Sequence, residues 1–474
     1  GKNMKKININ DVTLDAYPLT AAQRIHNYSR LACPRNELLN IGTGLYIKQE
    51  TDFNVLREAV HEAINRQDSM RLRFTEIEEN GRKQLYQFVV PFDDRELEFV
   101  DFSNWKEEYA NEEIKKWTEI PFKFECSPMN RIVMVKLPDG YNGIYMNVNH
   151  LTMDSSSIVT FYRDVLEIYC HKKYNYPMPK PMKSYIEQLK KDLEYENNSP
   201  AKQRDKKYWE EIISESEPIY TDFTGMGKLL TQRREQNNPN LRYFNLYSSD
   251  VNAAISVFQL EKDPSERLLE FCRQNNVPFV CLLLMGMRTV LSKFNDNEKD
   301  ISIKSCVARR GTLLEKKSGG TRIHFFPIRT ILEPETTFID ACRIIQEEQN
   351  KLFRHANFDP VGFLNMRQEQ LNIPRGSSYE CMSLTYQPMT IEKSDKIPDI
   401  PYKSMWYSNG VAAQALYLTV MHRVNDNGLN FNFEYQKAIV SPDEMEYFYY
   451  YLCRVMFRGI ENKERTIGEI LEMI

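Results

Sequence analysis

The residues in this chain best placed for chemistry are a histidine and an aspartate four residues apart, His150 and Asp154. An imidazole changes charge near neutral pH, so it can accept or donate a proton during a reaction. The spacing alone is weak evidence, because a pair of this kind arises by chance in many sequences. The elements that position the pair must therefore decide whether it is a site.

The sequence before and after His150 predicts a strand, a loop and a helix. Apolar and polar side chains alternate over residues 144–149, which is the period of a half-buried strand. Three serines at 155–157, followed by apolar residues, are typical of a loop that enters a helix. His150 is therefore expected at the exit of a strand, where functional residues often lie on a rigid scaffold.

Length and composition predict a globular α+β protein of two lobes. At 474 residues the chain exceeds one usual hydrophobic core. A stretch rich in Lys, Asn, Pro and Glu at 174–206 is typical of a connection, so we expect an N-terminal lobe at 1–215 and a C-terminal lobe at 216–474. Helices are expected around 19–31, with Thr20 as its N-cap, and at 55–64, 185–196, 265–274 and 280–287; strands at 70–74, 84–90, 131–136, 143–148, 300–307 and 323–332.

Charge and cysteine content argue against several classes of partner. The net charge of −4 gives no basic face for nucleic acid, and no apolar run is long enough to span a bilayer. The nine cysteines are scattered without a CxxC pair, so neither a disulfide framework nor a metal site is predicted. We expect reduced thiols and a cytoplasmic location.

Several separated segments, in order, resemble the condensation domain of nonribosomal peptide synthetases. Residues 17–23 (YPLTAAQ) are similar to the first motif of that family, residues 65–74 to the second, and residues 149–155 (NHLTMDS) to its active-site HHxxxDG motif. Later matches are Ser305–Arg310 with Gly320–Arg329, His355–Pro360 and Pro374–Ser378. The resemblance covers nearly the whole chain, and its specificity depends on the set of motifs together.

This resemblance implies a fold and a set of partners. Members have two chloramphenicol acetyltransferase-like lobes arranged as a V-shaped pseudo-dimer, with the active-site histidine at the joint. Donor and acceptor enter from opposite faces on the phosphopantetheine arms of peptidyl or acyl carrier proteins, and coenzyme A is the alternative carrier. No intrinsic cofactor or metal is implied, and a domain of this kind is expected to be monomeric.

The resemblance also implies roles for the motif residues. His150 corresponds to the catalytic histidine, either as a general base or as a group that positions the amine. Asp154 is expected to bind an arginine from the second half of the chain; Arg329, Arg309 and Arg310 are the candidates.

This sequence departs from the motif at two positions. Asn149 replaces the first histidine, and its amide could still shape the loop. Ser155 replaces the glycine, and its side chain could restrict φ, narrow the substrate channel or donate to an oxyanion.

The predicted function is amide bond formation between an acyl or peptidyl thioester and the amine of a carrier-bound aminoacyl group. Met4 lies just before the first motif, so we expect a starter domain, which acylates the first amino acid, as in lipopeptide synthesis. Two alternatives stay open: a free-standing acyl-CoA-dependent acyltransferase, and a catalytically degenerate condensation-like domain that recruits partners.

Overall fold

The computed structural model describes residues 4–387, 390–391 and 394–474, and divides them into two compact units. Unit 1 consists of Gly1–Lys202, Ala308–Ile323 and Met389–Val411, and unit 2 of Gln203–Val307, His324–Pro388 and Ala412–Ile474. The chain first crosses between the units thirteen residues before the predicted boundary at 215/216. Two later segments then return to unit 1, and the predicted pair of continuous lobes contains no such exchange.

Unit 1 contains a five-stranded and a four-stranded sheet. The larger has the order β13-β3-β8-β7-β6 and the smaller β1-β2-β5-β4. The strands of the larger sheet are β3 (Asn40–Ile47), β6 (Glu98–Asp101), β7 (Asn130–Lys136), β8 (Asn142–Asn149) and β13 (Tyr402–Tyr407). Those of the smaller are β1 (Lys5–Ile9), β2 (Val12–Pro18), β4 (Leu72–Glu79) and β5 (Arg82–Val89).

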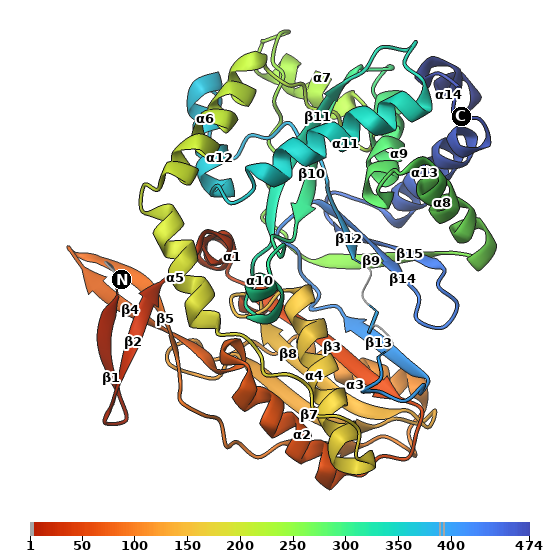
Figure 1. Cartoon of the computed structure of the whole chain (residues 1–474). Helices are drawn as coiled ribbons and strands as arrows, with labels where there is room; N and C mark the ends of the chain where they lie inside the picture. The colour runs from red at the N-terminus through yellow and green to blue at the C-terminus, as the bar shows by residue number, and fades with distance from the viewer. Residues whose placement is uncertain (1–3, 388–389, 392–393) are drawn as a thin grey trace. The chain divides into compact units, whose positions relative to one another are not determined.

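Helices cover both faces of the larger sheet. Figure 1 shows α2 (Phe53–Arg66) and α4 (Ser155–Tyr174) side by side, and both pack on one face; α3 (Glu107–Thr118) packs on the other. The remaining helices of unit 1 are α1 (Ala21–Ala32), α5 (Tyr185–Glu196) and α10 (Leu313–Lys317), with short 3-10 turns η1 (Asn36–Leu39) and η2 (Asp68–Arg71).

The central strand β8 confirms the strand predicted at 143–148, but it is buried on both faces. Ile144, Met146 and Val148 pack with α2 and α4, whereas Tyr145 packs against α3 through Trp117. The alternation predicted a half-buried strand because Asn and Tyr were taken as solvent-facing. The polar groups of that second face are satisfied inside the protein: the Tyr145 hydroxyl, for example, lies 2.7 Å from Thr118 Oγ1.

Unit 2 is built on one six-stranded sheet of order β11-β10-β12-β14-β15-β9. Its strands are β9 (Ala253–Leu260), β10 (Asp300–Val307), β11 (His324–Ile331), β12 (Ser383–Gln387), β14 (Leu416–His422) and β15 (Leu429–Gln436). Its helices are α6 (Pro200–Glu215, which starts at the boundary), α7 (Gly227–Glu235), α8 (Lys262–Asn275), α9 (Phe279–Phe294), α11 (Phe338–Arg354), α12 (Pro360–Leu371), α13 (Pro442–Glu461) and α14 (Ile467–Met473).

The apolar helix α9 forms the centre of the core of unit 2, where it packs between the sheet and α13. Over the described residues no single helix is long and apolar enough to cross a membrane; α8 and α9 together meet that length and composition, but they are bent by 112°. All nine cysteines are free thiols.

Candidate active site

His150 follows directly on β8, at the predicted strand exit. Its main-chain N–H donates to the carbonyl of Leu39 over 2.8 Å, which continues the pairing of β8 with the chain before β3. The imidazole is half-buried, and its Nδ1 lies 3.3 Å from the hydroxyl of Thr321. The other ring nitrogen, Nε2, has no hydrogen-bond partner among the residues described, so it is the nitrogen available to a substrate.

Asn149 shapes the turn that carries the histidine. Its side-chain Oδ1 accepts the N–H of Leu151 at 2.9 Å, and its carbonyl accepts both the N–H and the hydroxyl of Thr152. Its side chain is buried. The amide thus closes the loop locally.

Asp154 begins α4 as its N-cap. The carboxylate accepts the N–H of Ser157, and the Ser157 hydroxyl lies 3.0 Å from the N–H of Asp154, which completes a capping box. This arrangement satisfies N–H groups that the first turn of a helix otherwise leaves unpaired. The aspartate therefore sets where the loop ends and the helix begins.

The same carboxylate is fully buried and bound to Arg310. One terminal nitrogen of the guanidinium lies 2.9 and 3.0 Å from the two oxygens of Asp154, and the main-chain N–H of Arg322 donates to Oδ2 over 2.8 Å. Burial by itself would raise the pKa of Asp154, but Arg310 and these N–H donors lower it below its usual value. The carboxylate is therefore charged at neutral pH, and it ties the loop to residues 310–322.

Of the three arginines predicted as partners of Asp154, the structure pairs it with Arg310. Arg329 belongs to unit 2, where it lies on β11 and binds Asp300 with two nitrogens at 2.8 and 2.7 Å. Arg309 directs its Nε–H to the carbonyl of Arg322 at 2.8 Å. Sequence order could not separate the three, because the choice depends on which segment returns to unit 1.

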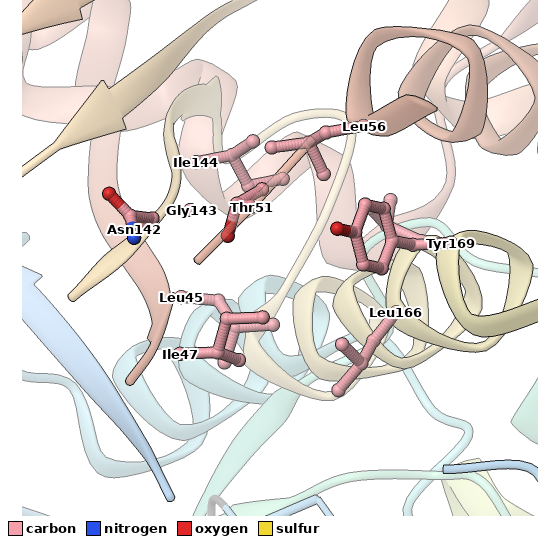
Figure 2. A pocket seen from close by; sticks show the side chains of 10 residues that line it. Leu45, Ile47, Thr51, Leu56, Asn142, Gly143, Ile144, Leu166 and Tyr169 are labelled. Atoms are coloured by element: carbon pink, nitrogen blue, oxygen red, sulfur yellow. The ribbon is translucent and has the colours of Figure 1, made fainter. Parts of the chain in front are cut away.

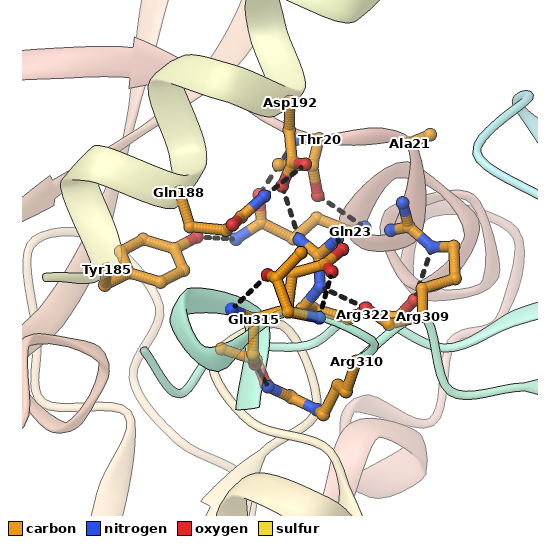
Figure 3. A network of polar contacts seen from close by, with 12 residues as sticks. Thr20, Ala21, Gln23, Tyr185, Gln188, Asp192, Arg309, Arg310, Glu315 and Arg322 are labelled. Carbon is orange, nitrogen blue, oxygen red and sulfur yellow. Dashed lines mark hydrogen bonds and ion pairs between the residues drawn. The ribbon is translucent and has the colours of Figure 1, made fainter. Parts of the chain in front are cut away.

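Further ion pairs hold the segment that carries Arg310. Arg322 is buried and binds Asp192 of α5 at 2.7 Å and Glu315 of α10 at 2.9 Å, as Figure 3 shows. The Arg322 Nε–H also donates to the carbonyl of Arg309. These contacts fix both ends of the segment, so the guanidinium of Arg310 meets a preorganised carboxylate.

Ser155 is the first residue of α4 and is buried. Its φ does not lie in the left-handed region. A glycine is therefore not required by the backbone at this position, and the serine causes no strain of the kind considered from the sequence.

The environment keeps His150 uncharged near neutral pH. Burial lowers the pKa of His150 below its ordinary value, although the Asp154 carboxylate and a backbone hydrogen bond act in the opposite direction. A charged imidazole is disfavoured where water is partly excluded. The ring can therefore accept a proton or a hydrogen bond at pH 7.

Three contacts of the site were not predicted. Thr321 meets Nδ1 of His150, Arg322 donates its N–H to Asp154, and the ring of His26 from α1 stacks on His150. Thr321 and Arg322 fall inside a matched motif, but nothing in the motif indicated these contacts. His26 carries no local signal, because only folding brings α1 to the loop.

An apolar cavity lies elsewhere in unit 1, between the sheet and the pair α2 and α4 (Figure 2). Its volume is about 30 Å³, and Leu45, Ile144, Leu56 and Tyr169 are among its lining residues. This is room for a water molecule or two, and too little for an acyl chain. No group of three or more His, Cys, Asp or Glu side chains in the described residues is placed to hold a metal ion.

Comparison with known proteins identifies the family. A family model described as the condensation domain matches residues 13–473. One plipastatin synthase protein and surfactin synthase subunit 1, both of Bacillus subtilis (strain 168), are 23% and 21% identical to the chain, each over 96% of it. The chain spans only 17% and 12% of the lengths of these two proteins.

Solved structures show the same fold at low identity. The first condensation domain of the calcium-dependent antibiotic synthetase has a TM-score of 0.77 at 17% identity, over 96% of this chain and 98% of that one. The starter condensation domain of rhizomide synthetase, a mutant in complex with C8-CoA and Leu-SNAC, has a TM-score of 0.78 at 16% identity, over 95% and 96%. The predicted fold class, α+β with two chloramphenicol acetyltransferase-like lobes, is confirmed. Because the family model covers almost the whole sequence, the chain belongs to the condensation domains of nonribosomal peptide synthetases.

Proposed function

We propose that this chain forms an amide bond between an acyl group held as a thioester and the amine of an aminoacyl group. Condensation domains are acyltransferases that form amide bonds, and the chain belongs to that family. The observation that carries the proposal is the uncharged imidazole of His150 at the exit of β8, with Nε2 available and Nδ1 beside Thr321.

In the proposed reaction the amine nitrogen attacks the thioester carbonyl carbon. The new C–N bond forms and the C–S bond breaks, so the nitrogen loses a proton and the leaving thiolate gains one. His150 Nε2 accepts the proton, or a hydrogen bond from the amine, and both roles require the neutral ring. A proton held on the imidazole can then pass to the thiolate.

Asp154 has a structural role in this proposal. Its oxygens are used by Arg310, by the N–H of Arg322 and by the first turn of α4, so it does not face a substrate. It fixes the loop on which His150 lies, which matters because small displacements of a catalytic group reduce its rate strongly.

We further propose that donor and acceptor arrive on the phosphopantetheine arms of carrier proteins, with plain acyl groups as donors, as in a starter domain. The likeness to the starter condensation domain that holds C8-CoA supports this version. The nine free thiols agree with the cytoplasmic location that we propose with it.

A panel of donors and acceptors tests the proposal. Acyl-CoA donors of increasing length, and aminoacyl- and dipeptidyl-carrier donors, are each offered with aminoacyl-SNAC acceptors, and the amide product is measured by mass spectrometry. We expect amide formation, with kcat/KM rising along the plain acyl series because each buried methylene contributes about 0.8 kcal/mol. A preference for peptidyl donors would contradict the starter version alone. Absence of amide from every donor on the panel would contradict the amide-forming function.

The same assay separates the two alternatives. A free-standing acyltransferase would transfer the acyl group from CoA to a small alcohol or amine in solution as well as to the aminoacyl thioester. A degenerate domain would make no product with any pair. The intact Asp154–Arg310 pair and the neutral His150 favour an active enzyme over the degenerate one.

A further inference from the structure

The ring of His26 lies flat against the ring of His150. The two centroids are 3.8 Å apart and the planes differ by 25°. His26 is on α1, far from the motif in sequence, and it is half-buried. The contact covers one face of the imidazole to which the proposed chemistry is assigned.

Helix α1 is held against the motif loop by a second contact on the same side. Gln23 and His26 are three residues apart, so they share a face of the helix. The side-chain amide of Gln23 donates to the carbonyl of Leu151 over 2.9 Å, one residue after His150. The same amide contacts Gln87 and the hydroxyl of Tyr185, which connects α1 to β5 and α5 (Figure 3).

These contacts restrain the His150 ring from two directions. His26 restrains the ring at one face, and the Thr321 hydroxyl meets Nδ1 at an edge. Rotation of the imidazole would separate it from both partners. Nε2 is therefore the part of the ring that stays clear of them.

The stacked pair takes up one proton readily and a second with difficulty. Burial, and the charge of His150 when it is protonated, lower the pKa of His26 well below its ordinary value. Asp154 is the charged group that acts on His150, and its own charge is bound by Arg310. On α1 the nearest charge is Arg24, which is paired with Glu196 of α5, and Thr321 is uncharged. His26 thus stays neutral while His150 titrates.

We propose that His26 is a positioning residue for His150: its neutral, stacked ring holds the imidazole in the orientation that presents Nε2 to the amine and shields it from water. This inference rests on the proposed function of His150. His26 itself does not contact the reacting atoms.

Variants of His26 test the proposal in the acyl transfer assay. His26→Ala removes the ring, His26→Phe keeps a flat ring without nitrogen, and His61→Ala on α2 is the matched control. We expect kcat to fall about 10- to 100-fold in His26→Ala with KM little changed, since misplacement of a catalytic group acts on the transition state. His26→Phe should recover most of that loss, and His61→Ala should behave as the wild type.

A titration of the histidines gives a readout that does not need substrate. The chain has seven histidines, so selectively labelled imidazoles can be assigned by substitution. In His26→Ala the pKa of His150 should rise toward its ordinary value because water reaches the ring, and the acid limb of the rate profile should move to higher pH with it. In His26→Phe it should stay low. In His150→Ala the pKa of His26 should rise, because the repulsion is gone.

The outcomes separate this inference from the proposed function. Wild-type kcat and an unshifted His150 in His26→Ala, or equal losses in His26→Ala and His26→Phe, would overturn the role of His26. Wild-type rate in His150→Ala would overturn the proposed function instead. If His26→Ala is not folded, His26→Leu replaces it, because leucine fills the space without a flat ring, and the same outcomes apply.

Discussion

Each unit has a strand that enters a long helix through five residues, and the two connections differ in what binds them. In unit 1, β8 leads through 150–154 to α4; in unit 2, β15 leads through 437–441 to α13. Both helices have 20 residues and begin with a capping box, on Asp154 and on Ser441. The backbone design is therefore the same, and the cap alone does not make a site.

The difference lies in the partners from distant segments. The first loop is buried apart from the half-exposed His150, and α1, η1 and residues 319–322 contact it. In the second loop Lys437 and Ala438 are exposed, and Ser441 pairs with Glu444 of its own helix. Function is thus added to a common connection by the residues that reach it from elsewhere.

The largest expected effect is on rate, at the first residue of each loop. His150→Ala should lower the rate of amide formation about 10²- to 10⁴-fold while the melting temperature stays unchanged, because a proton acceptor is lost and no buried partner is left unpaired. Lys437→Ala, at the matched position in unit 2, should keep the wild-type rate. Equal effects of the two substitutions would break the contrast between the loops.

The next effect is on stability, at the last residue of each loop. Asp154→Asn should destabilise unit 1 by about 3–5 kcal/mol, because Arg310 is left buried without its counter-charge. Urea unfolding followed by circular dichroism measures this. The double variant with Arg310→Gln should lose less than the sum of the two single losses. Additive losses, or a stable Asp154→Asn variant that has lost only rate, would show that the carboxylate acts on the reaction.

Acid should reduce the contribution of Asp154. Because its pKa is lowered in the folded protein, the stabilisation is complete above the unfolded pKa of about 3.9 and is lost as pH falls through the folded pKa. The difference in melting temperature between the wild type and Asp154→Asn should therefore be constant from pH 7 to about 4 and shrink below that. A difference that already disappears between pH 7 and 5 would point to another group.

The smallest effect is expected at the cap of unit 2. Ser441→Ala should cost about 1 kcal/mol, the usual value for a lost N-cap, with no change in the rate of amide formation. Thermal unfolding and the same amide assay measure both quantities. A loss as large as that of Asp154→Asn would show that the two connections are equally important for stability.

Local sequence determined most of the elements that carry the site. The alternation at 143–148 and Thr20 as the cap of the helix over Ala21–Ala32 are confirmed, and so is the helix that follows the three serines. Such features depend on neighbours within a few residues, so a single sequence displays them. The set of motifs also indicated the family and, through it, His150 and Asp154 as the residues to examine.

Tertiary structure alone decided what those residues contact. Arg310 rather than Arg329 binds Asp154 because residues 308–323 return to unit 1, and nothing local in the sequence marks that return. The stacking of His26 on His150 likewise depends on Gln23 and the packing of α1. Periodicity and capping record interactions along one element. Contacts between residues more than a hundred positions apart depend on how the elements pack together, and the sequence of either partner carries no sign of the other.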